Sequence, residues 1–252
     1  MRYLHFEILL LLVLSVFQFS CQKKDSPLIA LSEEFPPLNY TYKDSVLGCS
    51  TEIVRELFKR TNIQGEISII KWIDAYDEAK KRPNTVIFSI ARTHEREKLF
   101  NWIGQITVAE SNVFASKRNA GINIESYKDI ARYKTSLIKG SYVSDFFRDK
   151  GIDINDEQYA NSPIELVNKI MSGETELIIL NKLVFNYTVR NLGYYLSDFK
   201  EVLRIPELDK KYYVAISKNS DPDIVEKLQT AYKTLEKENF IESALSKYLN
   251  TN

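Results

Sequence analysis

The sequence predicts an α/β protein, because segments with the pattern of strands alternate with segments with the pattern of helices from Pro27 onward. Two segments carry this most clearly. Leu177 to Leu180 is a short, wholly apolar run, as expected for a strand in a sheet that is covered on both faces. Ser162-Pro163-Ile164-Glu165 has the N-cap serine, first-turn proline and capping-box glutamate that begin a helix.

The first half of the chain supplies strands and one clear amphipathic helix. Apolar residues at helical spacing predict a helix that contains Ile53 and Leu57 and ends near Asn62. Strands are predicted at 28–31, 67–70 and 86–90, and a longer extended segment at 106–116.

The second half repeats this alternation. A strand at 134–138 runs into Gly140-Ser141-Tyr142 and then a helix closed by Gly151. The helix that begins after Ser162 stops at Gly173. The remaining expected elements are a strand at 177–180, a helix at 183–192, a strand at 212–217, a long helix after Asp221-Pro222 and a last helix containing Phe240 and Tyr248.

Composition excludes several classes of function. Lys plus Arg and Asp plus Glu each number 34 among the 252 residues, so no basic excess points to nucleic acid. Two His and two Cys are scattered without the spacing of a metal site, and nothing else in the sequence indicates a cofactor. If the other cysteine, Cys21, is lipidated, no disulfide within the chain is possible, and Cys49 is then expected to be a small packed residue.

The N-terminus has the pattern of an export signal. An apolar run from Ile8 to Phe17 is shorter than the roughly 20 residues that span a bilayer and fits the core of a secretory signal. The run ends at Ser20-Cys21 and turns polar at once. Residues 1–21 resemble a bacterial lipoprotein signal peptide, in which Cys21 is lipidated and becomes the mature N-terminus; simple export is the alternative.

The segment from Ser89 to Phe100 carries the strongest functional signal. It follows the apolar run at 86–88, so Ser89 is expected at a strand end, with Arg96 seven residues later at a turn into a helix. Arginine presents a rigid fork of donors that matches a carboxylate in two places. The alternative is an ordinary strand-to-helix turn with a solvated charge cluster.

This segment resembles the carboxylate site of family 3 extracellular solute-binding proteins, the amino-acid receptors of ABC importers. In that family a hydroxyl residue follows this strand, and the arginine of a T-x-E-R segment binds the α-carboxylate of the ligand. Here Ser89 and Arg96 occupy those positions. The resemblance implies a two-lobe periplasmic binding protein-like α/β fold with two hinge strands. Carried onto this chain, it gives lobe one as 26–112 plus 210–252 and lobe two as 113–209.

Other segments extend the resemblance. Glu34-Phe35-Pro36-Pro37-Leu38-Asn39-Tyr40 is similar to the family's aromatic-Pro-Pro-aromatic loop, which implies that Tyr40 contacts the ligand. Trp72 follows the second strand, where relatives often carry an aromatic residue, and either the pocket or the core would suit it. Ser141, at a predicted helix N-terminus, keeps the hydroxyl of the family's Gly-Thr-Thr-like segment.

One position departs from the family. The strand at 177–180 resembles one that ends, in amino-acid receptors, in an aspartate that binds the ligand's ammonium; this chain has Asn181. Either the ligand lacks a free α-ammonium, or another carboxylate supplies the missing charge. Glu174, Glu176 and Asp74 are the candidates.

The resemblance implies a non-enzymatic receptor, monomeric and extracytoplasmic. It would capture a small polar carboxylate, an amino acid or a related compound, for an ABC permease, and would be held at the membrane by its N-terminal lipid. Two alternatives remain open: an enzyme similar to cyclohexadienyl dehydratases, which would need a carboxylate in the cleft, and a sensory or orphan receptor.

Overall fold

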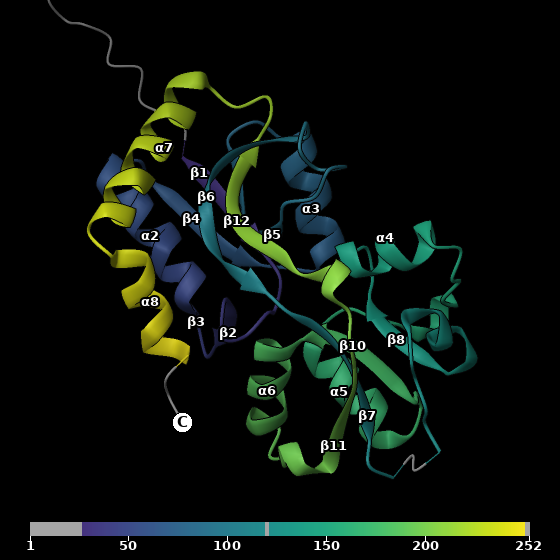
Figure 1. The fold of residues 1–252 in the computed structure, drawn as a ribbon. Helices are drawn as coiled ribbons and strands as arrows, with labels where there is room; N and C mark the ends of the chain where they lie inside the picture. Colours follow the sequence, from purple (N-terminus) through teal and green to yellow (C-terminus); the bar gives the residue numbers. More distant parts are fainter. Residues whose placement is uncertain (1–26, 119–120, 250–252) are drawn as a thin grey trace, which may run out of the picture.

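The computed structural model describes residues 27–118 and 121–249, which form two α/β bodies joined by crossing strands (Figure 1). The predicted signal segment and Cys21 lie outside the described residues. The described part contains no helix long and apolar enough to cross a membrane.

The first body is built on a five-stranded sheet with the strand order β4-β1-β5-β12-β6. β1 pairs in parallel with β4 and β5, and β12 is antiparallel to β5 and β6. Its strands are β1 (Leu28–Ser32), β4 (Gly65–Ile69), β5 (Thr85–Ala91), β6 (Phe100–Ala109) and β12 (Lys210–Ser217). A hairpin of β2 (Tyr40–Tyr42) and β3 (Ser45–Leu47) lies beside it.

Helices cover both faces of this sheet. α2 (Cys49–Thr61), α7 (Pro222–Lys237) and α8 (Phe240–Leu249) share one apolar cluster with the strands. α3 (Trp72–Lys81) packs through Trp72 and Ala79 on the other face. The helix ends follow the sequence pattern, since Asn62 closes α2 in the left-handed conformation and the Asp221 side chain caps α7. Cys49 is buried and free, as predicted.

The second body has a five-stranded sheet with the order β11-β7-β10-β8-β9. Its strands are β7 (Ser111–Ser116), β8 (Thr135–Ile138), β9 (Tyr159–Ala160), β10 (Leu177–Asn181) and β11 (Phe199–Arg204). Its helices are α4 (Tyr142–Asp149), α5 (Pro163–Ser172) and α6 (Lys182–Asn191). Short 3-10 helices span Tyr127–Arg132, Asp156–Gln158, Leu196–Asp198 and Pro206–Leu208. The predicted caps are confirmed, since Ser162 begins α5 and Gly173 ends it.

The segment at 106–116 is extended, as predicted, but it belongs to two strands in different sheets, because β6 ends at Ala109 and β7 begins at Ser111. The helix predicted after Arg96 was wrong: a series of turns at 94–99 leads directly into β6. Beyond that, the sequence reasoning missed the β2–β3 hairpin and β11.

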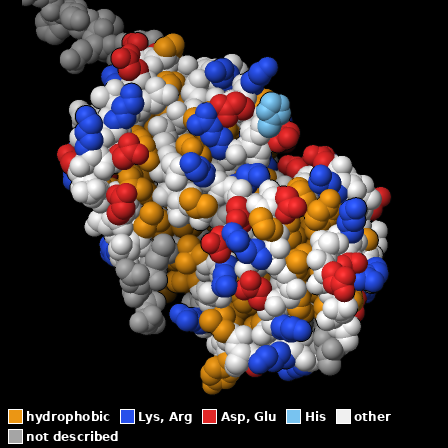
Figure 2. Space-filling view, in the orientation of Figure 1, with side chains coloured by type: hydrophobic (Ala, Val, Ile, Leu, Met, Phe, Trp, Pro, Cys, Tyr) orange, Lys and Arg blue, Asp and Glu red, His pale blue; other side chains and the backbone are white. Residues whose placement is uncertain are grey.

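The chain passes between the bodies twice, at Glu110 between β6 and β7 and at 205–209 between β11 and β12. On the face shown in Figure 2, positive and negative side chains are interspersed, as expected from the equal numbers of acidic and basic residues.

Candidate functional site

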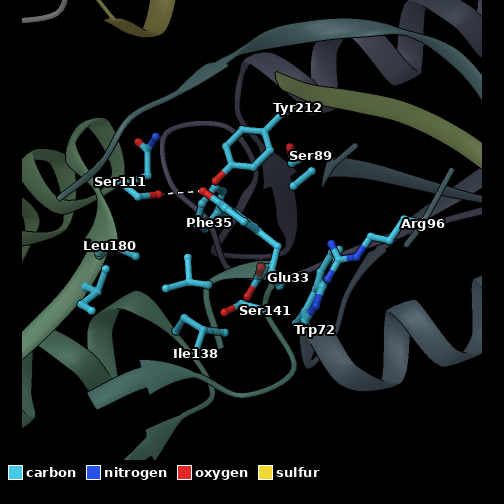
Figure 3. Close-up of a pocket in the computed structure, with 15 residues that line it drawn as sticks. Glu33, Phe35, Trp72, Ser89, Arg96, Ser111, Ile138, Ser141, Leu180 and Tyr212 are labelled. Atoms are coloured by element: carbon cyan, nitrogen blue, oxygen red, sulfur yellow. Dashed lines mark hydrogen bonds between the residues drawn. The ribbon is translucent and has the colours of Figure 1, made fainter. Parts of the chain in front are cut away.

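A narrow pocket of about 40 Å³ lies where the two bodies meet, at the carboxyl ends of parallel strands from both sheets. Open α/β sheets bind ligands at this edge because the loops that follow the strands converge there. Figure 3 shows that the lining side chains come from both bodies. They are Glu33, Phe35, Trp72, Ser89, Ala91, Arg96, Ser111, Ile138, Ser141, Tyr142, Val143, Ile179, Leu180, Asn181 and Tyr212.

Five of the six residues predicted at the binding site line this pocket: Trp72, Ser89, Arg96, Ser141 and Asn181. Tyr40 does not. It stands on the β2–β3 hairpin, and its ring packs 5.6 Å from that of Tyr187 on α6. Phe35, the aromatic residue on the other side of the two prolines, lines the pocket instead. A ligand contact at Tyr40 stays a prediction.

Arg96 is the most deeply placed cation at the pocket, with 3% of its side chain exposed. Its guanidinium lies over the rings of Tyr76, at 4.9 Å, and Trp72, at 5.5 Å. One nitrogen is 3.5 Å from Asp145 Oδ2, a long contact that bridges the two bodies. Asp145 is shared, since its other oxygen pairs with Arg148 at 2.7 Å. Arg96 thus retains donors for a further acceptor.

Ser89 is not at the strand end that the sequence suggested. It is the extra residue of a β-bulge within β5, where Phe88 pairs with Val214 and Ile90 with Tyr213. Its φ of 56° is in the left-handed region, which a serine rarely adopts. The hydroxyl donates to Asn39 and contacts Ser50 at 3.0 Å, so a buried polar network fixes the bulge.

Trp72 and Ser141 both line the pocket and belong to different bodies. The Trp72 indole donates to the Gly140 carbonyl at 2.9 Å. Gly140 has φ +68°, and a Cβ there would lie 2.8 Å from Ile73, so glycine suits this close approach. Ser141 caps α4 by accepting from the Ser144 backbone at 3.2 Å, which leaves its own hydroxyl proton available to the pocket.

Asn181 ends β10 and caps α6. Its Oδ1 accepts from the backbone of Leu183 at 2.9 Å and of Val184 at 3.1 Å. Only an acceptor can make these two bonds, so the amide nitrogen is the atom left over for the pocket. Asn181 therefore presents a donor to the pocket, not the acceptor that an ammonium would need.

Glu33 is the residue that the sequence reasoning missed and the structure makes most conspicuous. It directly follows β1, lines the pocket, and has a buried Oε2 with no hydrogen-bond partner in the described part of the chain. Burial raises its pKa from 4.5 to about 8, although the nearby Arg96 charge works in the other direction. An acid as the first polar side chain after a parallel strand was the signal that could have found it.

The carboxylates considered as replacements for the missing charge lie elsewhere. Glu174 pairs with Lys169, and Glu176 accepts from the Lys134 backbone at 2.8 Å. Asp74 is in the first turn of α3, and none of the three lines the pocket. Among the described residues, no group of His, Cys, Asp and Glu is placed to hold a metal ion.

Aromatic hydroxyls complete the wall. The Tyr142 hydroxyl is 2.7 Å from Ser111 Oγ, the contact drawn as a dashed line in Figure 3. The Tyr142 and Tyr212 rings meet edge to face at 6.3 Å. Burial raises the pKa of both tyrosines, so both hydroxyls are neutral at physiological pH. Apolar walls with a few convergent polar groups are typical of small-molecule sites.

Comparison with solved structures shows the periplasmic binding protein-like fold. A Streptococcus pneumoniae substrate-binding protein with bound histidine superposes with a TM-score of 0.76 at 19% identity, over 89% of this chain and 92% of that one. A histidine kinase sensor domain with similarity to periplasmic binding proteins gives a TM-score of 0.78 at 15% identity, over 89% of this chain and 96% of that one.

Comparison of the sequence with known proteins agrees with the structural similarity. The chain is 22% identical over 233 residues to the arginine-binding extracellular protein ArtP of Bacillus subtilis, which covers 89% of this chain and 86% of ArtP. The family model of the bacterial extracellular solute-binding proteins, family 3, matches residues 28–251. This match spans nearly all of the described structure, so the chain belongs to the family 3 bacterial extracellular solute-binding proteins.

Proposed function

We propose that this protein captures a small carboxylate-bearing solute, an amino acid or a close relative, outside the cytoplasm and delivers it to an ABC permease. The observation that carries the proposal is Arg96: a buried guanidinium, held over two aromatic rings, at the pocket where both sheets end. A desolvated arginine of this kind binds a carboxylate strongly and in a fixed orientation.

The expected site extends from Arg96 to both bodies. Trp72 and Phe35 contribute apolar surface, and Ser141 with the first turn of α4 offers donors to the same carboxylate. The α4 N-terminus alone would be a weak anion site, but Asp145 in its first turn lies 3.5 Å from Arg96, so the helix end and the guanidinium are close together. A carboxylate bound between them would join the two bodies.

Binding is expected to require movement of one body against the other. A pocket of about 40 Å³ holds only a few water molecules, since each needs roughly 10–15 Å³. The connections at 110 and 205–209 are the natural hinges. The closed form would then dock on the permease, and no chemical step is assigned to the protein.

A thermal-shift panel tests this function. The mature chain is mixed with each of the twenty L-amino acids and with the des-amino carboxylic acid that matches each. A ligand at 100 times its dissociation constant should stabilise the folded state by about 2.7 kcal/mol. If no compound of either set raises the melting temperature, the proposed ligand class is wrong.

A second candidate function is sensing, because a histidine kinase sensor domain has the same fold. The ligand site would be the same, and only the membrane partner would differ. Reconstitution in vesicles with the candidate permease separates the two, because ligand-stimulated ATP hydrolysis by the transporter is expected of a delivery protein and not of a sensor.

The N-terminal anchor gives a separate prediction. We propose that Cys21 is lipidated and tethers the mature chain to the membrane. Cys21→Ser should release the protein into the soluble fraction, because the acyl chains that hold it would be absent. Fractionation of cells that express each form measures this. Wild-type protein recovered as soluble material after osmotic shock would contradict the anchor and leave export alone.

A further inference from the structure

Glu33 and Arg96 form the only pair of opposite charges on the pocket wall, as far as the described residues extend. Glu33 is the one acidic lining residue and Arg96 the one basic lining residue. They are close enough for the arginine to oppose the rise in the pKa of Glu33. Both belong to the first body, Glu33 after β1 and Arg96 after β5, and these two strands are direct parallel neighbours.

One oxygen of the Glu33 carboxylate lacks a hydrogen-bond partner within the described part of the chain. Its Oε2 is buried and receives no hydrogen bond from any described residue. A buried polar atom without a partner costs free energy, and at the wall of a pocket a bound molecule can supply the missing partner. Glu34, its neighbour, shows the contrast: its carboxylate accepts from the Thr41 backbone at 2.9 Å.

The other polar groups described near the pocket do not offer a free, negatively charged hydrogen-bond acceptor. Asn181 uses its oxygen to cap α6 and turns a donor to the pocket. Asp145 is engaged by Arg96 and Arg148 and lies in the adjoining groove rather than on the pocket wall. Glu33 is thus left as the acid that could receive a cationic group of a bound molecule.

We propose that Glu33 binds the α-ammonium of a zwitterionic ligand whose carboxylate lies on Arg96, so that both charged groups of the ligand find their oppositely charged partners in the first body. This rests on the proposed function of the pocket. The amide nitrogen of Asn181, in the second body, then donates to an acceptor of the same ligand. The Glu33 carboxylate, in the first body, thus supplies the negative charge that Asn181 lacks.

Ligand binding should be coupled to a proton. The groups that face Glu33 are Arg96 from the turn after β5, Tyr142 from α4 and Tyr212 from β12. The pKa of Glu33 is about 8 without ligand, so the carboxyl must lose its proton before it pairs with an ammonium. Affinity for an amino acid should therefore rise between pH 6 and pH 8. A carboxylic acid that lacks the amino group should not show this rise.

The test uses isothermal titration of wild type, Glu33→Gln and Glu34→Gln with the amino acid that stabilises wild type most and with its des-amino acid. Glu33→Gln should weaken binding of the amino acid at least tenfold and change the affinity for the des-amino acid less than threefold. It should also abolish the dependence of amino-acid affinity on pH. Glu34→Gln is the matched control and should leave both affinities within threefold.

The outcomes distinguish failure of the ammonium site at Glu33 from failure of the proposed function. If wild type binds the des-amino acid as tightly as the amino acid, the carboxylate pocket stands but the ammonium site at Glu33 is overturned. The same holds if Glu33→Gln binds the amino acid with unchanged affinity, or loses both ligands equally. If wild type binds neither class, the proposed function itself has failed.

Discussion

Replacing Arg96 with methionine should weaken binding of the carboxylate ligand at least thirtyfold. Methionine retains an apolar stem against Trp72 and Tyr76 but removes the charge and the fork of donors. Truncating one partner of a buried, hydrogen-bonded charge pair costs about 2–5 kcal/mol, and 2 kcal/mol is roughly thirtyfold in the dissociation constant. Isothermal titration with the best amino acid of the panel measures the loss.

Arg92 provides the matched control. It lies four residues earlier in the same turn region, pairs with Glu97 at 2.6 Å, and stacks on Trp102 and Tyr213 away from the pocket. Arg92→Met should leave ligand affinity within threefold. Equal losses in the two variants would mean that Arg96 acts through the fold of this segment rather than by contact with the ligand.

Replacing Glu33 with glutamine should stabilise the ligand-free protein, and increasingly so as the pH rises from 5 to 8. In the unfolded chain Glu33 ionises near pH 4.5, whereas burial raises its pKa to about 8 in the folded state. Between these values the folded protein binds the extra proton, so stability falls as the pH rises. The penalty reaches a few kcal/mol above pH 8, since a pKa difference of one is worth about 1.4 kcal/mol.

Glutamine has a similar shape and never ionises, so Glu33→Gln should avoid this penalty. The melting temperature at pH 8 should rise by about 5 °C or more, while near pH 4.5 the variant and wild type should be nearly equal. Glu34→Gln should give no comparable gain, because the Glu34 carboxylate already accepts a hydrogen bond from Thr41. Destabilisation by Glu33→Gln at pH 8 would mean that the ionised carboxylate has a partner.

A site that costs stability in the free protein is consistent with a binding role. Proteins commonly tolerate an unsatisfied group where a ligand completes it, and removing that group gains stability at the expense of function. Glu33→Gln is expected to do both, with a higher melting temperature and a lower affinity for an amino acid.

The elements with strong local signals were predicted from the sequence. Ser162-Pro163 with Gly173 fixes both ends of α5, and the apolar run at 177–180 is the buried strand β10. The break between β6 and β7 was missed because the residues from Ile106 to Ser116 are all compatible with an extended chain. Which of two sheets a strand joins depends on pairing partners distant in the sequence, Lys210–Ser217 for β6 and Leu177–Asn181 for β7.

The candidate site was only partly predictable from the sequence, because the atoms that each residue offers depend on tertiary contacts. Trp72, Ser89, Arg96, Ser141 and Asn181 were predicted as site residues from the resemblance of their segments to those of family 3 proteins, and all line the pocket. Which atoms they offer could not be predicted. The oxygen of Asn181 is taken by the backbone of α6, and the hydroxyl of Ser89 by Asn39. Both facts depend on tertiary contacts.

The loop after β1 shows most clearly what could not be predicted from the sequence. Phe35 and Tyr40 flank the same two prolines, and the sequence does not indicate which ring turns inward. Phe35 packs edge to face with Tyr212 at 5.6 Å, which holds it at the pocket, while Tyr40 begins the β2–β3 hairpin and packs against Tyr187 of α6. Glu33 resembles a surface acid in the sequence, and only the packing around it reveals its burial.

Binding of a ligand carboxylate by Arg96 in the pocket between the two sheets can be tested by a crystal structure with the amino acid that gives the largest thermal shift. The ligand should lie between the two bodies, with its carboxylate oxygens about 2.7–2.9 Å from the Arg96 guanidinium and near Ser141. A ligand bound elsewhere, such as the neighbouring groove beside His94 and Asp149, or one whose carboxylate pairs with a different cation, would contradict it.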